Sequence, residues 1–208
     1  MKTVIYFHIC CANNWTQIFN MLMSNIKISG LYDAVDEIRC VVLGEAVISD
    51  PKIKVIYQTL DLSVYEFKIM ELMYQDALHE DFRVLYIHTK GIKHYGSKNV
   101  ADWVKLLVYY NIVNYEFCLQ MLNQYDAVGV NLQNNPVWHF SGNFWWSTSR
   151  HIRTLGQIAD FSYNGPEFYI CSNMNASYVS LWNSGVNHYE SPYSMDNYVG
   201  KIALKNNV

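Results

Sequence analysis

The sequence predicts an α/β protein in which helices flank a central, mostly parallel mixed sheet. Short apolar runs rich in β-branched and aromatic residues, such as Thr3–Ile9 and Val84–Ile87, alternate with longer segments that carry apolar residues at helical spacing. Such runs are typical of strands buried on both faces. Strands that alternate with helices form βαβ units with right-handed crossovers, and these units build a mostly parallel sheet.

The strands are expected in seven short runs, of which the fourth stops abruptly in polar residues and the sixth is rich in aromatic residues. In chain order they are Thr3–Ile9, Glu37–Leu43, Lys54–Gln58, Val84–Ile87, Ala127–Val130, Ser141–Ser147 and Val179–Trp182.

Four helices are expected between these strands. The first is capped by Asn13 or Asn14 and runs to about Ile26, and Ser29-Gly30 ends it. The others run from a capping Ser63 through Leu78, over Val100–Gln124 as the longest helix, and from Pro166, a residue favoured in a first helical turn.

The composition is that of one folded domain over residues 1–208, which could also be one domain of a longer protein. Of the 208 residues, 51% are hydrophobic and 16% are charged. The formal net charge of -3 argues against nucleic-acid binding by phosphate neutralisation. The five cysteines form no CxxC pair, so reduced thiols in a cytoplasmic protein are expected. No apolar run reaches transmembrane length.

The fourth strand is followed by the polar turn His88-Thr89-Lys90-Gly91. Ligands of open α/β sheets bind at the carboxyl ends of the strands. Lys90 supplies a positive charge and Thr89 a hydroxyl for an anionic ligand, and Gly91 permits a close backbone approach. A solvated loop after a strand is the alternative, and the tetrapeptide alone favours neither.

The first strand ends in a second polar turn around His8-Ile9-Cys10. The chain contains neither GxGxxG nor GxxxxGK[ST], so a Rossmann dinucleotide site is disfavoured and a P-loop is excluded. What is left is an imidazole beside a helix N-terminus, which suits a base or a phosphate. A satisfied core histidine is the alternative for His8.

A Ser-Gly-Asn turn lies between aromatic residues in the block His139–Trp146. Gly142 lets the backbone come close to a ligand, Ser141 and Asn143 offer hydrogen-bonding groups, and tryptophan faces can stack on a sugar. Core packing does not easily explain His139, Ser141 and Asn143 together.

These segments resemble a known family. The order is a strand with His-Thr-Lys-Gly, a helix with a tryptophan, Tyr-Asp-x-Val-Gly, His-Phe-Ser-Gly-Asn-Phe-Trp-Trp, a glutamate and Asn-His-Tyr. Over about Tyr65–Tyr198 this order is similar to small GT-A-type nucleotide-sugar glycosyltransferases. It is particularly similar to a glycosyltransferase domain of large chlorella viruses that is linked to capsid glycans. Tyr86–Gly91 and His139–Trp146 are the specific blocks.

The resemblance implies a single GT-A-like domain and a distribution of roles. The donor would contact His8, Ile9, Cys10, His88, Thr89, Lys90 and Gly91, and the region facing donor sugar and acceptor would contain His139, Ser141, Gly142, Asn143 and Trp145. Lys90 would neutralise the departing diphosphate. Glu167, in the first turn of its helix, is the best candidate for a general base, with Asp160 as competitor and an ordinary helix-capping glutamate as the alternative.

A divalent cation is also implied, Mn²⁺ or Mg²⁺. GT-A enzymes usually end the motif strand in Asp-x-Asp, whereas this chain has His88-Thr89-Lys90. His88 and His188 are therefore the candidate metal ligands, and imidazole suits Mn²⁺ better than Mg²⁺.

The expected function is transfer of a sugar from a UDP-sugar to a hydroxyl of a glycan or glycoprotein, in the host cytoplasm if the protein is viral. Two other readings stay open: a non-catalytic carbohydrate-binding module that uses the aromatic faces, and a nucleotide-binding domain that has lost catalysis.

Overall fold

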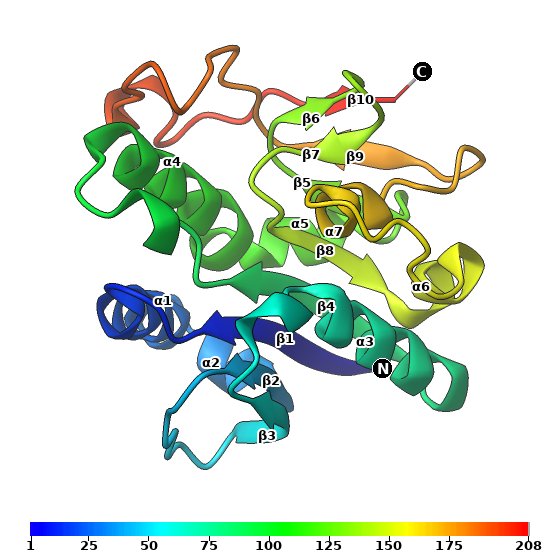
Figure 1. The fold of residues 1–208 in the computed structure, drawn as a ribbon. Helices are drawn as coiled ribbons and strands as arrows, with labels where there is room; N and C mark the ends of the chain where they lie inside the picture. The colour runs from blue at the N-terminus through cyan, green and yellow to red at the C-terminus, as the bar shows by residue number, and fades with distance from the viewer. Residues whose placement is uncertain (208) are drawn as a thin grey trace.

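Eight strands form one mixed sheet in the order β10-β9-β5-β8-β4-β1-β2-β3 in the computed structural model, which describes residues 1–207 (Figure 1). They are β1 (Lys2–Cys10), β2 (Glu37–Leu43), β3 (Ile53–Thr59), β4 (Phe82–His88), β5 (Ala127–Gly129), β8 (Trp145–Thr148), β9 (Tyr178–Ser180) and β10 (Lys205–Asn206). The strands from β3 to β4 are parallel, β8 is antiparallel to both its neighbours, and β5 and β9 are again parallel. A separate pair consists of β6 (Leu132–Gln133) and β7 (His139–Phe140). The expected α/β class with a mostly parallel mixed sheet is thereby confirmed.

Helices cover both faces of the sheet, as Figure 1 shows. One face carries α1 (Trp15–Ile28), α2 (Leu31–Ala34), α4 (Lys98–Val108), the π-helix η3 (Tyr109–Val113) and α5 (Tyr115–Met121). The other carries α3 (Phe67–His79), α6 (Ser149–Leu155) and α7 (Gly165–Tyr169). Short 3₁₀ turns are η1 (Leu62–Val64), η2 (Ile92–His94) and η4 (Met195–Asn197). No helix in the described part of the chain is long and apolar enough to cross a membrane.

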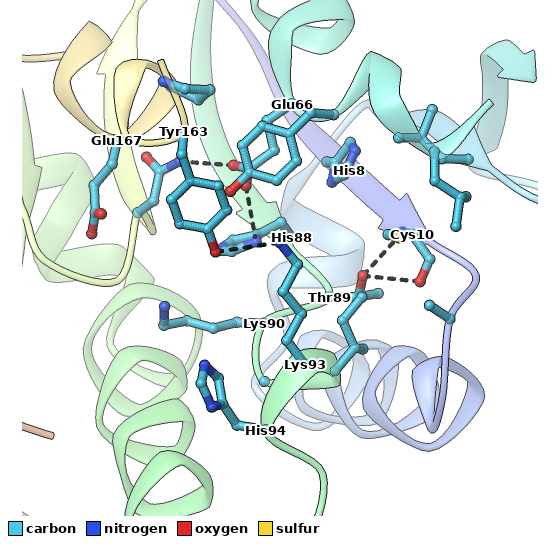
Figure 2. Close-up of a pocket in the computed structure, with 18 of the residues that line it drawn as sticks. His8, Cys10, Glu66, His88, Thr89, Lys90, Lys93, His94, Tyr163 and Glu167 are labelled. Carbon is cyan, nitrogen blue, oxygen red and sulfur yellow. Dashed lines mark hydrogen bonds and ion pairs between the residues drawn. The ribbon is translucent and has the colours of Figure 1, made fainter. Parts of the chain in front are cut away.

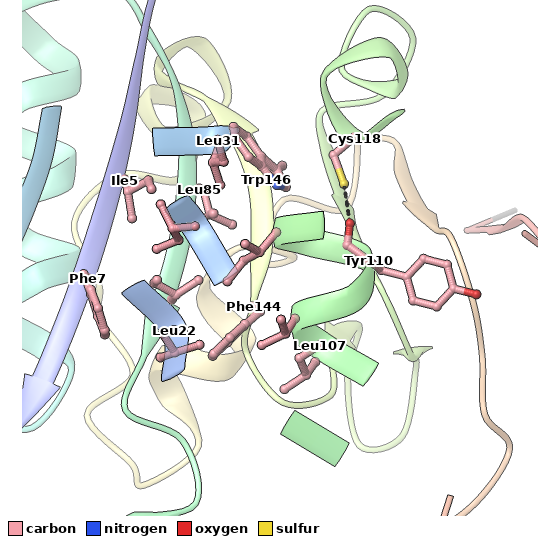
Figure 3. Packing of buried hydrophobic residues seen from close by; sticks show 14 of the residues in the cluster. Ile5, Phe7, Leu22, Leu31, Leu85, Leu107, Tyr110, Cys118, Phe144 and Trp146 are labelled. Carbon is pink, nitrogen blue, oxygen red and sulfur yellow. Dashed lines mark hydrogen bonds between the residues drawn. The ribbon is translucent and has the colours of Figure 1, made fainter. Parts of the chain in front are cut away.

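Alternation along β1 decides which side chains reach which face. Ile5 and Phe7 belong to the apolar cluster under α1 and α4, where Figure 3 shows them among its buried residues. Tyr6 belongs to the cluster under α3. Because successive strand residues point to opposite faces, the side chain of His8 follows that of Tyr6 and lies on the α3 face at the carboxyl end of the strand.

The predicted long helix over Val100–Gln124 is wrong, because α4 ends at Val108 and a π-helix follows. Two side-chain amides bond backbone carbonyls here: Asn111 Nδ2 donates to Leu107 O at 3.0 Å and Asn114 Nδ2 donates to Tyr109 O at 2.7 Å. Such amides compete with the regular helical ladder. The backbone carbonyl of Asn111 accepts a hydrogen bond from the indole N–H of Trp146 at 2.8 Å. This bond connects the π-helix η3 to strand β8 of the sheet.

Two further boundaries differ from expectation. Ser63 does not cap α3. It lies in η1, where its backbone N–H is bonded by Asp61, and Glu66 is the N-cap of α3. The strand expected over Ser141–Ser147 begins only at Trp145, since Gly142 and Asn143 have positive φ values of 99° and 56° and form a turn. Elements α2, α6, β6, β7 and β10 were not expected from the sequence.

A cluster of charged side chains links β2 to α3 near the amino end of β4. Arg39, whose exposed fraction is 8%, donates from Nη1 to Asp76 and to Tyr6 OH, each at 2.7 Å, and contacts Glu37 and Glu80. Glu37 is 3% exposed. A buried carboxylate of this kind is stable only while its cationic partners remain in place.

Glu37 should make the stability of the fold depend on pH. Burial opposes ionisation, but hydrogen bonds from Lys2, Lys54 and Arg39 outweigh it and lower the pKa of Glu37 from 4.5 to about 2. A folded-state pKa below the unfolded value contributes stability above about pH 4.5, and this is lost as the pH falls through 2. Urea unfolding of Glu37→Gln should show a flatter loss of stability in this window and a stability at pH 7 lower by about 3–5 kcal/mol. Glu45→Gln, at an exposed carboxylate, is the control; equal profiles for both variants would contradict the role of Glu37.

Candidate functional site

The two central parallel strands β1 and β4 end side by side, with His8 paired in register to His88. The backbone N–H of Thr89 donates to His8 O, and the Thr89 hydroxyl accepts from the N–H of Cys10, both at 3.0 Å (Figure 2). Thr89 is 2% exposed. Its hydroxyl therefore joins the strand ends and is not free for an anionic ligand.

A cavity of about 260 Å³ opens at these strand ends. Its walls come from the ends of β1 and β2, the segment before α3, the turn after β4, the start of α7 and the loop at Tyr189. Figure 2 shows His8 and Cys10 at one end and Glu167 at the other, with Lys90 reaching in between. Segments far apart in the sequence thus form one elongated site.

Glu66 places a carboxylate in the floor of the cavity. It is 4% exposed and accepts hydrogen bonds from the hydroxyl of Tyr86 and from Asn143 Nδ2, the latter at 2.8 Å. His88 Nδ1 lies 3.5 Å from its other oxygen. As the N-cap of α3 it also lies where the helix dipole favours negative charge. The sequence analysis missed Glu66, because it placed this residue inside a helix that was expected to start at Ser63.

The two histidines of the floor are neutral. Burial, followed by the positive charge of Lys90, lowers the pKa of His88 to about 3. Burial is also the main reason that the pKa of His8 falls to about 4. His88 Nε2 lies 3.2 Å from Gly142 O, whereas His8 Nε2 has no hydrogen-bonding partner among residues 1–207.

Lys90 is a cation that forms no ion pair with any carboxylate in the described part of the chain. Its Nζ lies 3.9 Å from the ring centroid of Trp103, a cation–π contact. Burial lowers the pKa of Lys90, and the charges of Glu167 and Glu66 oppose that shift. A partly desolvated amine of this kind is suited to an anionic ligand.

A second lysine lies at the mouth of the cavity, where the sequence analysis had placed nothing. Lys93 Nζ is 4.5 Å from the ring centroid of Tyr163 and 5.3 Å from that of Tyr65. The two tyrosine rings stack at 5.4 Å. The sequence does contain a signal for Lys93: it follows Lys90 by three residues, in the polar segment after the same strand.

Glu167 lies in the short helix α7 at the end of the cavity opposite His8 (Figure 2). Its Oε1 accepts the backbone N–H of Gly142 at 2.6 Å. Gly142 needs to be a glycine, because a Cβ there would lie 2.9 Å from Leu107 and 3.1 Å from the indole nitrogen of Trp103. One peptide segment therefore orients Glu167 through its N–H and His88 through its carbonyl.

Several expected site residues lie outside the cavity. Ile9 is buried in the core on the opposite face of the sheet. Trp145 is fully buried, stacks on Tyr86 and donates to Asn143 Oδ1 at 2.9 Å. His139 is buried against Phe168. Ser141 also lies away from the cavity, and its backbone N–H bonds Asn131 O at 3.1 Å. Gly142 does not line the cavity either; Asn143 is the residue of the block His139–Trp146 that does, and Gly142 contacts Glu167 and His88.

The expected metal ligands do not form a ligand set. His188 stacks on Trp103 at 5.1 Å, and its Nε2 contacts Ser184 Oγ at 2.8 Å and Asn131 at 3.2 Å. Both ring nitrogens of His88 already face Glu66 or Gly142. Within residues 1–207 no group of three or more His, Cys, Asp or Glu residues is arranged to hold a metal ion. The residues present therefore fit an anion beside Lys90 better than a divalent cation.

Comparison with known proteins gives a family without an assigned activity. No curated protein and no solved structure matches the chain significantly. The family model described as "Domain of unknown function (DUF8361)" matches residues 65–192, which is more than half of the chain and includes Glu66, Lys90 and Glu167. The protein therefore belongs to the DUF8361 family.

Proposed function

We propose that this protein is a GT-A-type glycosyltransferase that moves a sugar from a UDP-sugar to a hydroxyl of a glycan. The observation that carries the proposal is the order of groups along one cavity. An unpaired Lys90 lies between an end with apolar walls at His8 and a carboxylate at Glu167. A nucleotide-sugar has the same order of base, diphosphate and sugar, and the acceptor attacks at the sugar end.

Lys90 would neutralise the diphosphate as it leaves. Charge that develops on a departing phosphate is best stabilised by fixed cations in a site that excludes water. Lys90 is held against Trp103, and Lys93 lies at the mouth of the same cavity. The cation that GT-A enzymes bind through Asp-x-Asp would thus be replaced, at least in part, by a lysine in the chain. Mn²⁺ or Mg²⁺ stays an expectation for the titration below.

Glu167 would remove the proton from the acceptor hydroxyl. Its Oε1 is fixed by the Gly142 N–H, which leaves Oε2 to accept a proton. The cavity of about 260 Å³ lies just below the roughly 300–1,000 Å³ typical of ligand sites. The acceptor would therefore approach Glu167 from outside the cavity, after the donor has filled it.

The alternative functions have less support. A carbohydrate-binding module would use exposed tryptophan and tyrosine faces. Trp145 and Trp146 are both fully buried, and the exposed Tyr163 and Tyr189 line the same cavity as Lys90. A nucleotide-binding domain without catalysis would have the same cavity and would differ in turnover alone. The role in viral capsid glycan synthesis rests on the sequence resemblance and stays a prediction.

Titration with UDP, GDP and CMP, with and without Mn²⁺ and with EDTA, tests the proposal most directly. We expect UDP to bind in the cavity and to protect Cys10, which lines it, from alkylation. If EDTA leaves UDP affinity unchanged, Lys90 provides the neutralisation without a metal. Binding of none of these nucleotides would rule out the proposal. Binding without transfer or slow hydrolysis of any UDP-sugar would favour the domain that has lost catalysis.

Lys90→Ala should weaken UDP binding by about 10- to 100-fold, because a hydrogen bond to a charged group contributes roughly 1.5–3 kcal/mol. Uridine, which has no phosphate, should lose less than about threefold. Isothermal titration calorimetry measures both affinities. Lys98→Ala is the matched control at an exposed lysine. Equal losses for UDP and uridine would show that Lys90 does not contact the phosphates.

Glu167→Gln should reduce sugar transfer by about 10²–10⁴-fold while UDP affinity stays near that of the wild type. Glutamine keeps an oxygen for the Gly142 N–H but cannot accept the proton. The control is Asp160→Asn, at an exposed carboxylate whose Oδ1 accepts from Ser162 N at 2.8 Å. Transfer at the wild-type rate by a folded Glu167→Gln variant would assign Glu167 a structural role and favour a retaining mechanism.

A further inference from the structure

His8 lines the cavity and has a buried ring nitrogen that no described residue satisfies. The side chain is 3% exposed and lines the cavity, and Nε2 lacks a hydrogen-bonding partner among residues 1–207. A buried polar atom without a partner is costly. Such atoms are rare unless a ligand or an ordered water completes them.

The chemistry of that nitrogen can be assigned. Burial, the largest effect, and the nearby His88 lower the pKa of His8 to about 4, while Glu66 and a hydrogen bond with the Tyr65 backbone oppose this shift. The imidazole is therefore neutral near pH 7 and has one N–H and one lone pair. Because Nε2 is the nitrogen without a partner, the contact with the Tyr65 backbone is made by Nδ1–H, and the lone pair is on Nε2. The buried nitrogen without a partner is thus a hydrogen-bond acceptor in a residue that lines the cavity.

The surroundings of His8 suit a flat, mostly apolar group. Leu43 and Leu62 line the cavity together with His8 and Cys10, and Leu43 pairs in register with Cys10. The nearby carboxylate of Glu66 does not compete for the ligand, because Tyr86, Asn143 and His88 already surround it. The group that binds here needs apolar faces and one N–H or O–H donor on its edge.

We propose that His8 is the residue that selects the nucleobase, by accepting the N3–H of uracil at Nε2. This inference rests on the proposed binding of a UDP-sugar and adds the basis of its selectivity. Uracil has a donor at N3, whereas cytosine has an acceptor at the same position. Cytosine would place the lone pair of its N3 against that of the buried Nε2. The preference therefore comes from rejecting cytosine as much as from binding uracil.

Three ligands test the proposal on the wild-type protein: UDP, CDP and N3-methyl-UDP, compared by isothermal titration calorimetry. UDP should bind more tightly than CDP or N3-methyl-UDP by on the order of 10- to 100-fold, because a buried group left without its partner costs about this much affinity. In His8→Phe the acceptor is absent, and UDP and CDP should differ by less than about threefold. His79→Phe, at an exposed histidine at the end of α3, should keep the wild-type preference.

The outcomes separate the two proposals. Equal binding of UDP and CDP to the wild type would overturn the role of His8, would point to water as the partner of Nε2, and would leave the transferase proposal standing. A preference for UDP that persists in His8→Phe would also overturn it. Binding of no nucleotide would overturn both. If His8→Phe does not fold, the three ligands on the wild type still decide, because N3-methyl-UDP removes the same hydrogen bond from the ligand side.

Discussion

The parallel pairing of β1 with β4 is the constraint on which the candidate site depends. It brings His8 level with His88, although 80 positions separate them in the chain numbering. Thr89 then fastens the two strand ends to each other. Other segments complete the cavity at this junction: Glu66 comes from the start of α3, Glu167 from α7 and Tyr189 from the C-terminal loop. Since the strands lie in the middle of an eight-stranded sheet, the junction is held on both sides.

The sign of the charge at the end of β4 distinguishes this site from one built on paired aspartates. A carboxylate pair at the end of the motif strand needs a metal before it can accept a diphosphate. Here the same position has Lys90, and the carboxylate nearest to it in the floor, Glu66, is already surrounded by hydrogen-bond donors. The floor is therefore polar without being strongly anionic. Lys90 therefore places a fixed positive charge at the strand end where paired aspartates would place negative charge.

The sequence predicted what depends on short-range pattern and failed where distant contacts decide. The buried strands and the polar turns after β1 and β4 follow from local composition, and so do Lys90 and the helix that starts near Pro166. The end of α4 was missed, because it depends on which carbonyls Asn111 and Asn114 bond and on the demand of Trp146 for one of them. Glu66 was missed for a similar reason. Nothing adjacent to it in the chain reveals that Asn143, far along the sequence, will bond it.

Gly142 has a mechanical consequence for the molecule. Its N–H is bonded to the carboxylate at one end of the cavity, and its carbonyl is bonded to an imidazole in the floor. Leu107 and Trp103 leave no room for a side chain at this residue. The two peptide groups on either side of the Gly142 Cα therefore position Glu167 and His88. A larger residue at position 142 would therefore displace both side chains at once, because its Cβ would collide with Leu107 and Trp103.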